Sequence, residues 1–301
     1  MEKSNLKYLL AALGSFALWG FFAIPLRNIK SFPAEEILYY RIFTSLICIW
    51  VAILLFRRKQ LKADIQVIRE ITPAKRKTYF WQLLLATVFL MMNWYTFIHA
   101  VNNVSLTSAA FAYMVCPLLT AFGGFLILKE PLSGLKLLSL GLALVSIVFL
   151  ATGSLTEVLW STVIASFYAG YLIIQRKMQG LDKLNVLAVQ FALAVFILLP
   201  FYFFRHHGFP DSSWFWLNIL AIAVVFTIIP LFLSLYALIG IPSSTLGIMI
   251  YINPIIAFAV AILYFGQLIS LNQVYAYATL LFSVILFNSK QLREIFAAKS
   301  N

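Results

Sequence analysis

Apolar runs long enough to cross a lipid bilayer follow one another along nearly the whole chain. A helix of about 20 residues is about 30 Å long, which matches the hydrocarbon thickness of a membrane. Apolar residues make up 63% of the 301 residues and charged residues only 11%, whereas a soluble domain is about half apolar and about a quarter charged. The sequence therefore predicts an all-α integral membrane protein.

Ten such runs can be separated by their polar connections. They are residues 7–27, 36–56, 79–99, 105–128, 134–152, 157–177, 185–204, 214–238, 243–265 and 270–288. The first run resembles a signal sequence, but it continues to about Leu26 and has no clear small-residue cleavage site, so we interpret it as an uncleaved first span.

The positive charges predict the orientation, because Lys and Arg concentrate on the cytoplasmic side of membrane proteins. With a cytoplasmic N-terminus, 18 of the 22 Lys and Arg residues lie on that side. Only Arg27, Lys30 and Arg205 lie outside, and Arg41 lies within a span. We therefore expect ten transmembrane helices with both termini, including the tail 289–301, in the cytoplasm, and a multi-pass location in the bacterial inner membrane, which is the plasma membrane.

Residues 57–77 form the one long connection, a basic cytoplasmic loop. Leu61, Ile65, Ile68 and Ile71 recur there at helical spacing among cations. One interpretation is a short helix that lies on the anionic inner leaflet. The other is a solvated loop whose only role is to fix the orientation of the chain.

Signals of catalysis, metal binding and nucleic-acid binding are missing from the sequence. Cys48 and Cys116 each lie within an apolar run, and His99, His206 and His207 have no carboxylates at ligand spacing. There is no HExxH sequence or P-loop, and no basic patch with base-stacking aromatic residues stands apart from the spans. We expect neither an enzyme nor a metal, a cofactor or a nucleic acid as partner.

The spacing of the spans predicts an internal repeat. Residues 89–150 and 226–287 align without a gap, and this alignment pairs Pro117 with Pro254. Five spans per repeat, an odd number, would make the two repeats inverted relative to one another. We expect the first five-helix repeat over 1–152, the second over 157–288, and a solute site between them.

Arg41 is the one cation inside a predicted span. A charge near the middle of a membrane costs roughly 2.5–3.5 kcal/mol on insertion scales. At about 100° per residue, neither Glu35 nor Glu36 shares the helix face of Arg41. That face carries small polar side chains instead, namely Thr44, Ser45 and Cys48. Arg41 either faces a polar cavity or is paired for structural reasons.

Polar and aromatic side chains inside other spans would complete a small-molecule site. We expect the apolar wall from Trp19, Trp94, Tyr113, Tyr168 and Tyr251, and hydrogen bonds from Asn93 and Asn253. The alternative for each is a core residue with its polar atoms satisfied.

Two prolines and one acid add to this prediction. Pro117 and Pro254 remove hydrogen bonds inside helices, and each is either a flexible helix break beside the cavity or a static kink. Glu36 is the candidate acid at the outer mouth. No Asp or Glu lies well within a span, so proton coupling has no support from the sequence.

Several stretches resemble RarD-like EamA transporters of the drug/metabolite transporter superfamily, over nearly the full length of the chain. They are LWGFFAIPL (18–26), FPAEEILYYR (32–41), NWYTFIHAVNN (93–103), FAYMVCPLL (111–119), LKEPL (128–132), SFYAGYLIIQRK (166–177) and IPSSTLGIMIYINPIIAF (241–258). The family-pattern positions are Trp19, Glu36, Arg41, Asn93, Trp94 and Asn103. The chain departs from the pattern at Cys116-Pro117, where Asn-Pro is typical, and at residues 265–267, where Phe-Gly-Gln replaces the usual Gly-Glu.

The resemblance implies ten helices in two inverted five-helix repeats and export of small metabolites or drugs. We therefore expect a transporter that works by alternating access through a central cavity, with a small organic solute and the phospholipid bilayer as its partners. Two alternatives remain: a lipid-linked carrier or flippase of the same superfamily, and a membrane scaffold that transports nothing.

Overall fold

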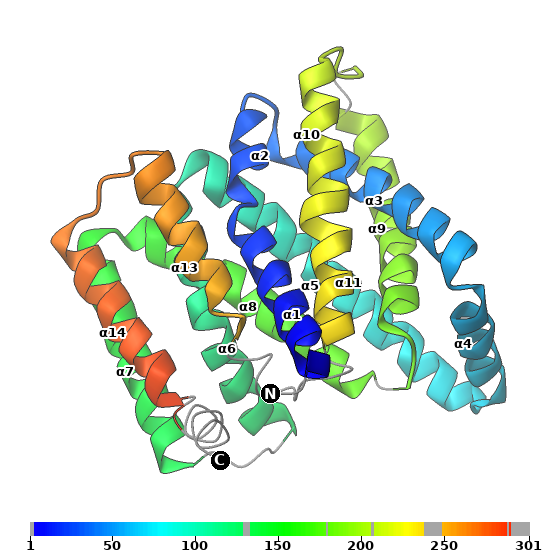
Figure 1. Ribbon diagram of the computed structural model, residues 1–301, viewed down its shortest axis with the longest axis horizontal. Coiled ribbons are helices and arrows are strands. Elements are labelled where there is room, and N and C mark those ends of the chain that lie inside the picture. Colours follow the sequence, from blue (N-terminus) through cyan, green and yellow to red (C-terminus); the bar gives the residue numbers. More distant parts are fainter. Residues whose placement is uncertain are drawn as a thin grey trace.

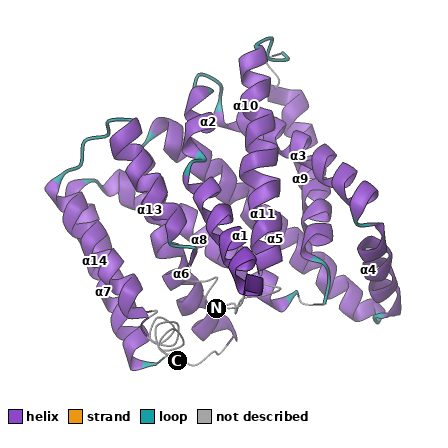
Figure 2. Cartoon of the chain, viewed as in Figure 1, coloured by secondary structure: helices purple, strands orange, loops and turns teal. Residues whose placement is uncertain are grey.

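The computed structural model describes residues 3–128, 133–178, 180–205, 208–237, 249–287 and 289. Every regular element of this part of the chain is a helix, as Figures 1 and 2 show, so the predicted all-α fold is confirmed there. The helices are α1 (Lys3–Gly20), α2 (Ala23–Asn28), α3 (Ala34–Phe56), α4 (Arg58–Glu70), α5 (Pro73–Asn103), α6 (Leu106–Leu128), α7 (Gly134–Gly153), α8 (Leu155–Lys177), α9 (Lys183–Arg205), α10 (Ser213–Ala223), η1 (Val224–Ile228), α11 (Ile229–Ala237), α13 (Ile252–Ala259), η2 (Val260–Tyr264) and α14 (Leu271–Phe287).

Seven helical segments of the described chain are long and apolar enough to cross a membrane. Three shorter apolar helices lie within the expected fifth, ninth and tenth spans: Gly134–Leu150, Ile252–Tyr264 and Leu271–Phe287. The predicted tail 289–301 and residues 243–248 of the ninth run lie outside the described residues, apart from residue 289.

The outer surface of the bundle is apolar. Large side chains such as Leu137, Leu144, Phe196 and Leu263 are more than half exposed. A soluble monomer rarely exposes apolar patches larger than a few hundred Å². Surrounding hydrocarbon removes that penalty, so this surface fits a protein embedded in a bilayer.

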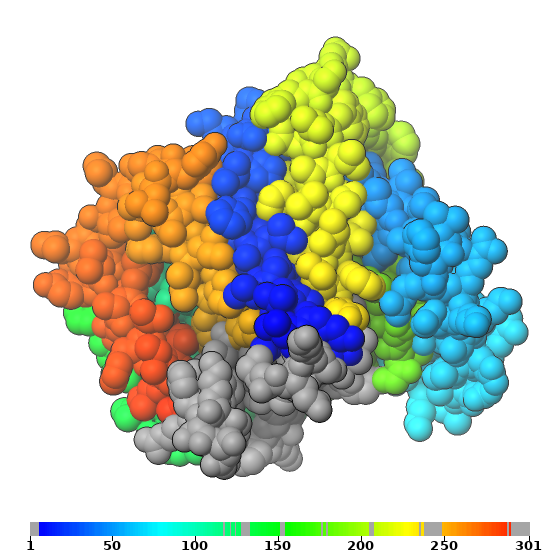
Figure 3. All heavy atoms as spheres, viewed as in Figure 1, coloured from blue at the N-terminus to red at the C-terminus, as the bar shows by residue number. Residues whose placement is uncertain are grey.

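The helices from the two ends of the chain interleave. The first helix α1 packs between α11 and α13, and Figures 1 and 3 show it in blue between their yellow and orange. The helix α8 packs against both α5 and α6, α3 packs along α9, and α7 packs along α14. The core therefore lies between helices that are far apart in sequence.

Gly20 lets α1 approach α13 closely. A Cβ atom built on Gly20 would lie 2.5 Å from the Cβ of Ile256 and 3.2 Å from the carbonyl oxygen of Asn253. Small residues bring transmembrane helices together because association in lipid depends on close packing. A larger residue at this position would push the two helices apart.

A π-helical turn interrupts the span that begins with α10. It covers η1, and α11 with Pro230 follows it directly. Pro230 has no N–H group, so the carbonyl oxygen of Phe226 loses its α-helical donor. The indole Nε1–H of Trp19 donates to this carbonyl at 3.0 Å. Neighbouring helices commonly supply such donors inside membranes, where water is absent.

The segment 57–77 is helical over most of its length rather than an irregular loop. α4 follows α3 directly, and α5 begins at Pro73 with Thr72 as its N-cap, whose hydroxyl accepts from the Lys75 N–H. The apolar positions of α4 include Ile65, which is exposed. The helix predicted in this segment is therefore present, and its contact with the inner leaflet stays a prediction.

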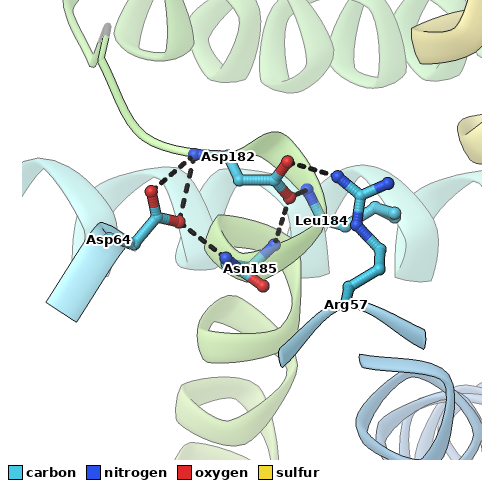
Figure 4. Close-up of polar contacts among 5 residues, drawn as sticks. All are labelled: Arg57, Asp64, Asp182, Leu184 and Asn185. Atoms are coloured by element: carbon cyan, nitrogen blue, oxygen red, sulfur yellow. Dashed lines mark hydrogen bonds and ion pairs between the residues drawn. The ribbon is translucent and has the colours of Figure 1, made fainter. Parts of the chain in front are cut away.

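A cluster of polar side chains ties α4 to the start of α9 (Figure 4). Asp64 accepts from the backbone N–H of Asp182 and, at 2.7 Å, from the side-chain amide of Asn185. Asp182 pairs with Arg57 at 2.6 Å and accepts from the N–H groups of Leu184 and Asn185. Asp182 is thus both an ion-pair partner and the N-cap of α9. We call these residues, Arg57, Asp64, Asp182 and Asn185, the α4–α9 cluster.

Candidate functional site

Arg41 on α3 is buried, with only 3% of its surface exposed. Its Nη2 donates to the hydroxyl of Thr227 at 3.1 Å. Its guanidinium carbon lies 3.9 Å from the ring centre of Trp94 and 4.8 Å from that of Phe22. Two aromatic faces and one hydroxyl therefore surround the charge, and Arg41 faces the interior of the bundle.

Most of the hydrogen-bonding capacity of this guanidinium is unused. The Nε and Nη1 atoms of Arg41 are buried and have no acceptor on the described residues, and no carboxylate there lies within ion-pair distance. A guanidinium carries five N–H donors. A desolvated cation–π contact contributes about 2 kcal/mol or more, and desolvation of a buried charge costs several kcal/mol. Two buried nitrogen atoms of Arg41, Nε and Nη1, are therefore left without an acceptor on the described residues.

The π-helical turn η1 positions the hydroxyl that holds Arg41. Thr227 is buried in this turn and its Oγ1 donates to the carbonyl oxygen of Ile222 at 2.8 Å. With its hydrogen committed there, the oxygen presents a lone pair to Arg41. π-Helical turns are rare and occur frequently at functional sites. Sequence reasoning did not select Thr227, although a Thr three residues before a proline in an apolar run was a visible signal.

Aromatic rings run in a series from Arg41 to α8. Phe22 stacks on Phe97 with ring centres 5.6 Å apart, and Phe97 contacts Tyr113 at 5.4 Å. Tyr113 meets Tyr168 edge to face at 5.7 Å. The structure thus brings the predicted Tyr113 and Tyr168 into one series with Arg41, through Phe22 and Phe97, which carry no polar atom to mark them in the sequence.

Trp94 and Asn93 are adjacent in α5, but their side chains make different contacts. The Trp94 ring covers Arg41 on one side and contacts Phe191 of α9 at 5.6 Å. Asn93 is fully buried, and its Nδ2 donates to the carbonyl oxygen of Ile164 at 2.9 Å. This bond joins α5 to α8, so the amide hydrogens of Asn93 already serve the packing of the bundle in part.

The remaining predicted residues, Trp19, Tyr251 and Asn253, lie in α1 and at the start of α13. The Trp19 indole bonds to η1, as described above. Tyr251 is buried just before α13, and the carbonyl of Asn253 faces Gly20. Among the described residues, no hydrogen bond joins Asn253 to Arg41. Trp19 therefore contacts the same π-helical turn that holds Arg41 through Thr227, whereas Tyr251 and Asn253 lie at the start of α13.

The predicted prolines and acid occupy distinct places. Pro117 lies within α6, which continues on both sides of it. Pro254 is in the first turn of α13, after a turn at Ile250 and Tyr251, so it follows an interruption of the helix instead of lying in mid-helix. Glu36 is buried in the first turn of α3, where the helix dipole favours an acid. Among the residues described, no group of His, Cys, Asp and Glu could hold a metal ion.

These features define a multi-pass helical membrane protein with a buried cation and aromatic rings in its interior. The profile of the EamA-like transporter family matches residues 6–152 and 155–289. The chain belongs to this family of membrane transporters, and its relatives place it among the RarD-like members.

The relatives are similar over most of their length. An uncharacterized transporter, YojE of Bacillus subtilis, is 28% identical over 95% of each chain. The protein RarD of Streptomyces exfoliatus is 30% identical, with 86% of this chain and 81% of that protein covered. The protein RarD of Escherichia coli is 28% identical over 88% of each chain.

A solved crystal structure has a similar fold. Its TM-score is 0.60, and the match covers 93% of this chain and 96% of that one at 17% identity. At this identity the match supports the fold of the bundle alone.

Proposed function

We propose that this transporter carries small organic solutes bearing a carboxylate or another strong hydrogen-bond acceptor, and that Arg41 anchors the acceptor group. The observation that carries this proposal is the buried guanidinium whose Nε and Nη1 have no acceptor on the described residues. The planar, positively charged guanidinium can donate hydrogen bonds to two oxygen atoms at once. The aromatic rings of Trp94 and Phe22 then offer apolar surface to the body of the solute.

We propose ten spans in two inverted repeats, 1–152 and 157–288, with both termini in the cytoplasm. The double match of the family profile supports two repeats. The packing supports them too, because α8 lies against α5 and α6 just as α1 lies against α11 and α13. In a two-fold arrangement α1 corresponds to α8, and the helix pairs α3–α9 and α7–α14 lie on the axis.

The solute would move by alternating access, with the site between the repeats opening to each side in turn. Export across the bacterial inner membrane is the direction that the family resemblance implies, and the asymmetry of Lys and Arg residues supports the orientation. Arg41 would lie about 10 Å from the outer end of α3, at 1.5 Å per residue.

The test is transport by the purified protein in lipid vesicles. Metabolite profiling of cells with and without the protein gives the leading solute, and its flux is then measured for the wild type, Arg41→Lys and Arg41→Gln. We expect Arg41→Gln to abolish flux and Arg41→Lys to retain part of it. The proposal is wrong if Arg41→Gln folds normally and carries the solute at the wild-type rate.

Arg27→Gln is the matched control. Arg27 is also partly buried, donates from Nε to the carbonyl oxygen of Val101 at 3.2 Å and lies 4.6 Å from the ring centre of Phe265. It resembles Arg41 in chemistry but lies apart from the ring series. Its loss should leave flux nearly unchanged. Lipid flux in the same vesicles tests the alternative of a lipid-linked carrier.

A further inference from the structure

Gln190 occupies the position in α9 that Arg41 occupies in α3. Both helices have 23 residues, and each of these side chains belongs to the eighth residue of its helix. The two helices pack against one another. If the repeats are inverted, as proposed above, Arg41 and Gln190 lie at equal depths, about 10 Å from opposite membrane surfaces.

Gln190 also resembles Arg41 in having a donor without an acceptor. Its side chain is 0% exposed, and its Oε1 accepts from Gln175 Nε2 at 3.4 Å. Its own Nε2 has no acceptor on the described residues. A buried donor left unpaired costs about 1–3 kcal/mol, and the hydrogen bond from Gln175 to Oε1 leaves this cost at Nε2 without compensation on the described residues.

Aromatic rings connect the two sites by two routes. Phe191 follows Gln190 in sequence and contacts Trp94, which covers Arg41. On the second route, the ring series continues from Tyr168 to Tyr171, stacked at 5.9 Å. The hydroxyl of Tyr171 accepts from Gln175 Nε2 at 2.9 Å, and Gln175 in turn meets Gln190.

We propose that Gln190 is a second solute-binding residue, on the cytoplasmic half of the same path. Its amide N–H would hold an acceptor oxygen of the solute when the site faces the cytoplasm, and Arg41 would hold that group when the site faces outward. A neutral donor binds an oxyanion more weakly than a guanidinium does, which favours onward passage to Arg41. This inference rests on the proposed transport function and on the inverted repeats.

Cysteine accessibility tests the inference without knowledge of the solute. In a background of Cys48→Ser and Cys116→Ala, the variants Gln190→Cys and Arg41→Cys are treated with a membrane-impermeant methanethiosulfonate bearing a sulfonate. Ala188→Cys is the control, because Ala188 lies in the same helix and is equally buried. Inside-out and right-side-out vesicles present the reagent to each face separately.

We expect Gln190→Cys to react at least about tenfold faster than Ala188→Cys in inside-out vesicles. Arg41→Cys should react faster in right-side-out vesicles than in inside-out vesicles. Equal, slow reaction of Gln190→Cys and Ala188→Cys would show a packed core and overturn the role of Gln190. Rapid reaction of Arg41→Cys in that case would leave the proposed role of Arg41 standing, so the two failures are distinguishable.

A binding measurement with a defined probe gives a second readout. Benzoate is titrated against the purified protein with tryptophan fluorescence as the signal, because Trp94 lies between Arg41 and Phe191. One lost hydrogen bond predicts about a fivefold to tenfold weaker binding for Gln190→Leu, while Gln190→Asn keeps an amide and checks folding. Unchanged affinity in Gln190→Leu together with loss of binding in Arg41→Gln would overturn the inference about Gln190 alone.

Discussion

The guanidinium carbon of Arg41 lies 3.9 Å from the ring centre of Trp94, on a neighbouring helix and in the interior of the bundle. This contact joins the charge on α3 to the aromatic wall on α5. A cation–π contact of this kind stabilises the cation by about 2 kcal/mol or more when both groups are desolvated. The ring of Phe22 and the hydroxyl of Thr227 add to this stabilisation, but Nε and Nη1 of Arg41 have no acceptor on the described residues, and no ion pair there neutralises the charge.

Replacement of Arg41 by an apolar residue should make the protein more stable while it stops transport. A buried charge without an ionic partner is unfavourable, and apolar replacements of buried charges commonly stabilise by about 1–4 kcal/mol. We expect Arg41→Met to raise the thermal unfolding midpoint in detergent by a few degrees. A fall in the midpoint would mean that Arg41 holds the bundle together and has a structural role.

Thr227→Val should weaken solute binding while it leaves the fold intact. The hydroxyl of Thr227 is the acceptor that orients Arg41 at 3.1 Å, and valine has nearly the same shape. Loss of one hydrogen bond to a charged group predicts roughly a tenfold or greater loss of solute affinity, because Arg41 is then no longer held in its orientation. Thr227→Ser keeps the hydroxyl and should restore binding. Equal affinities of the two variants would remove Thr227 from the site.

Gly20→Ala should destabilise the contact of α1 with α13. The added Cβ would lie 2.5 Å from the Cβ of Ile256, a separation that forces the helices apart, and overpacking of this kind costs typically 1–3 kcal/mol, or about 5 °C in the midpoint. The double variant Gly20→Ala/Ile256→Ala should recover part of that loss. Gly141→Ala is the control, since nothing lies within 4 Å of its Cβ position, and it should be neutral or slightly stabilising.

Loss of the carboxylate of Asp182 should destabilise the α4–α9 cluster more than loss of Arg57. Asp182→Ala removes both the ion pair and the N-cap of α9, and the cap alone contributes about 1 kcal/mol. Arg57→Ala removes only a partly exposed ion pair, with side chains 28% and 22% exposed, which contributes between about 0 and 1 kcal/mol. Thermal unfolding of both variants checks the order, and the reverse order would contradict the capping role.

The all-α membrane fold and the burial of Arg41 could be predicted from the sequence, because both follow from the cost of exposing polar groups to lipid. Helical periodicity placed Glu35 and Glu36 off the face of Arg41, and no ion pair links Arg41 to either in the structure. Of the two interpretations that the sequence allows for residues 57–77, the helix α4 agrees with the first in its secondary structure.

The neighbours of Arg41 could not be predicted, because they depend on how helices pack and not on periodicity. Phe22 lies at a break between α1 and α2, and Thr227 in a π-helical turn, and neither interruption follows from an apolar run. Phe97 has no polar atom to distinguish it from other apolar residues.

Binding of benzoate to purified wild-type protein, Arg41→Gln and Arg27→Gln, followed by tryptophan fluorescence and compared with binding of neutral benzamide, tests the central claim most directly. Wild type and Arg27→Gln should prefer benzoate to benzamide by at least about tenfold, and Arg41→Gln should lose this preference. An equal preference for benzoate in Arg41→Gln and the wild type would contradict the central claim, because the anion would then be held by some other group.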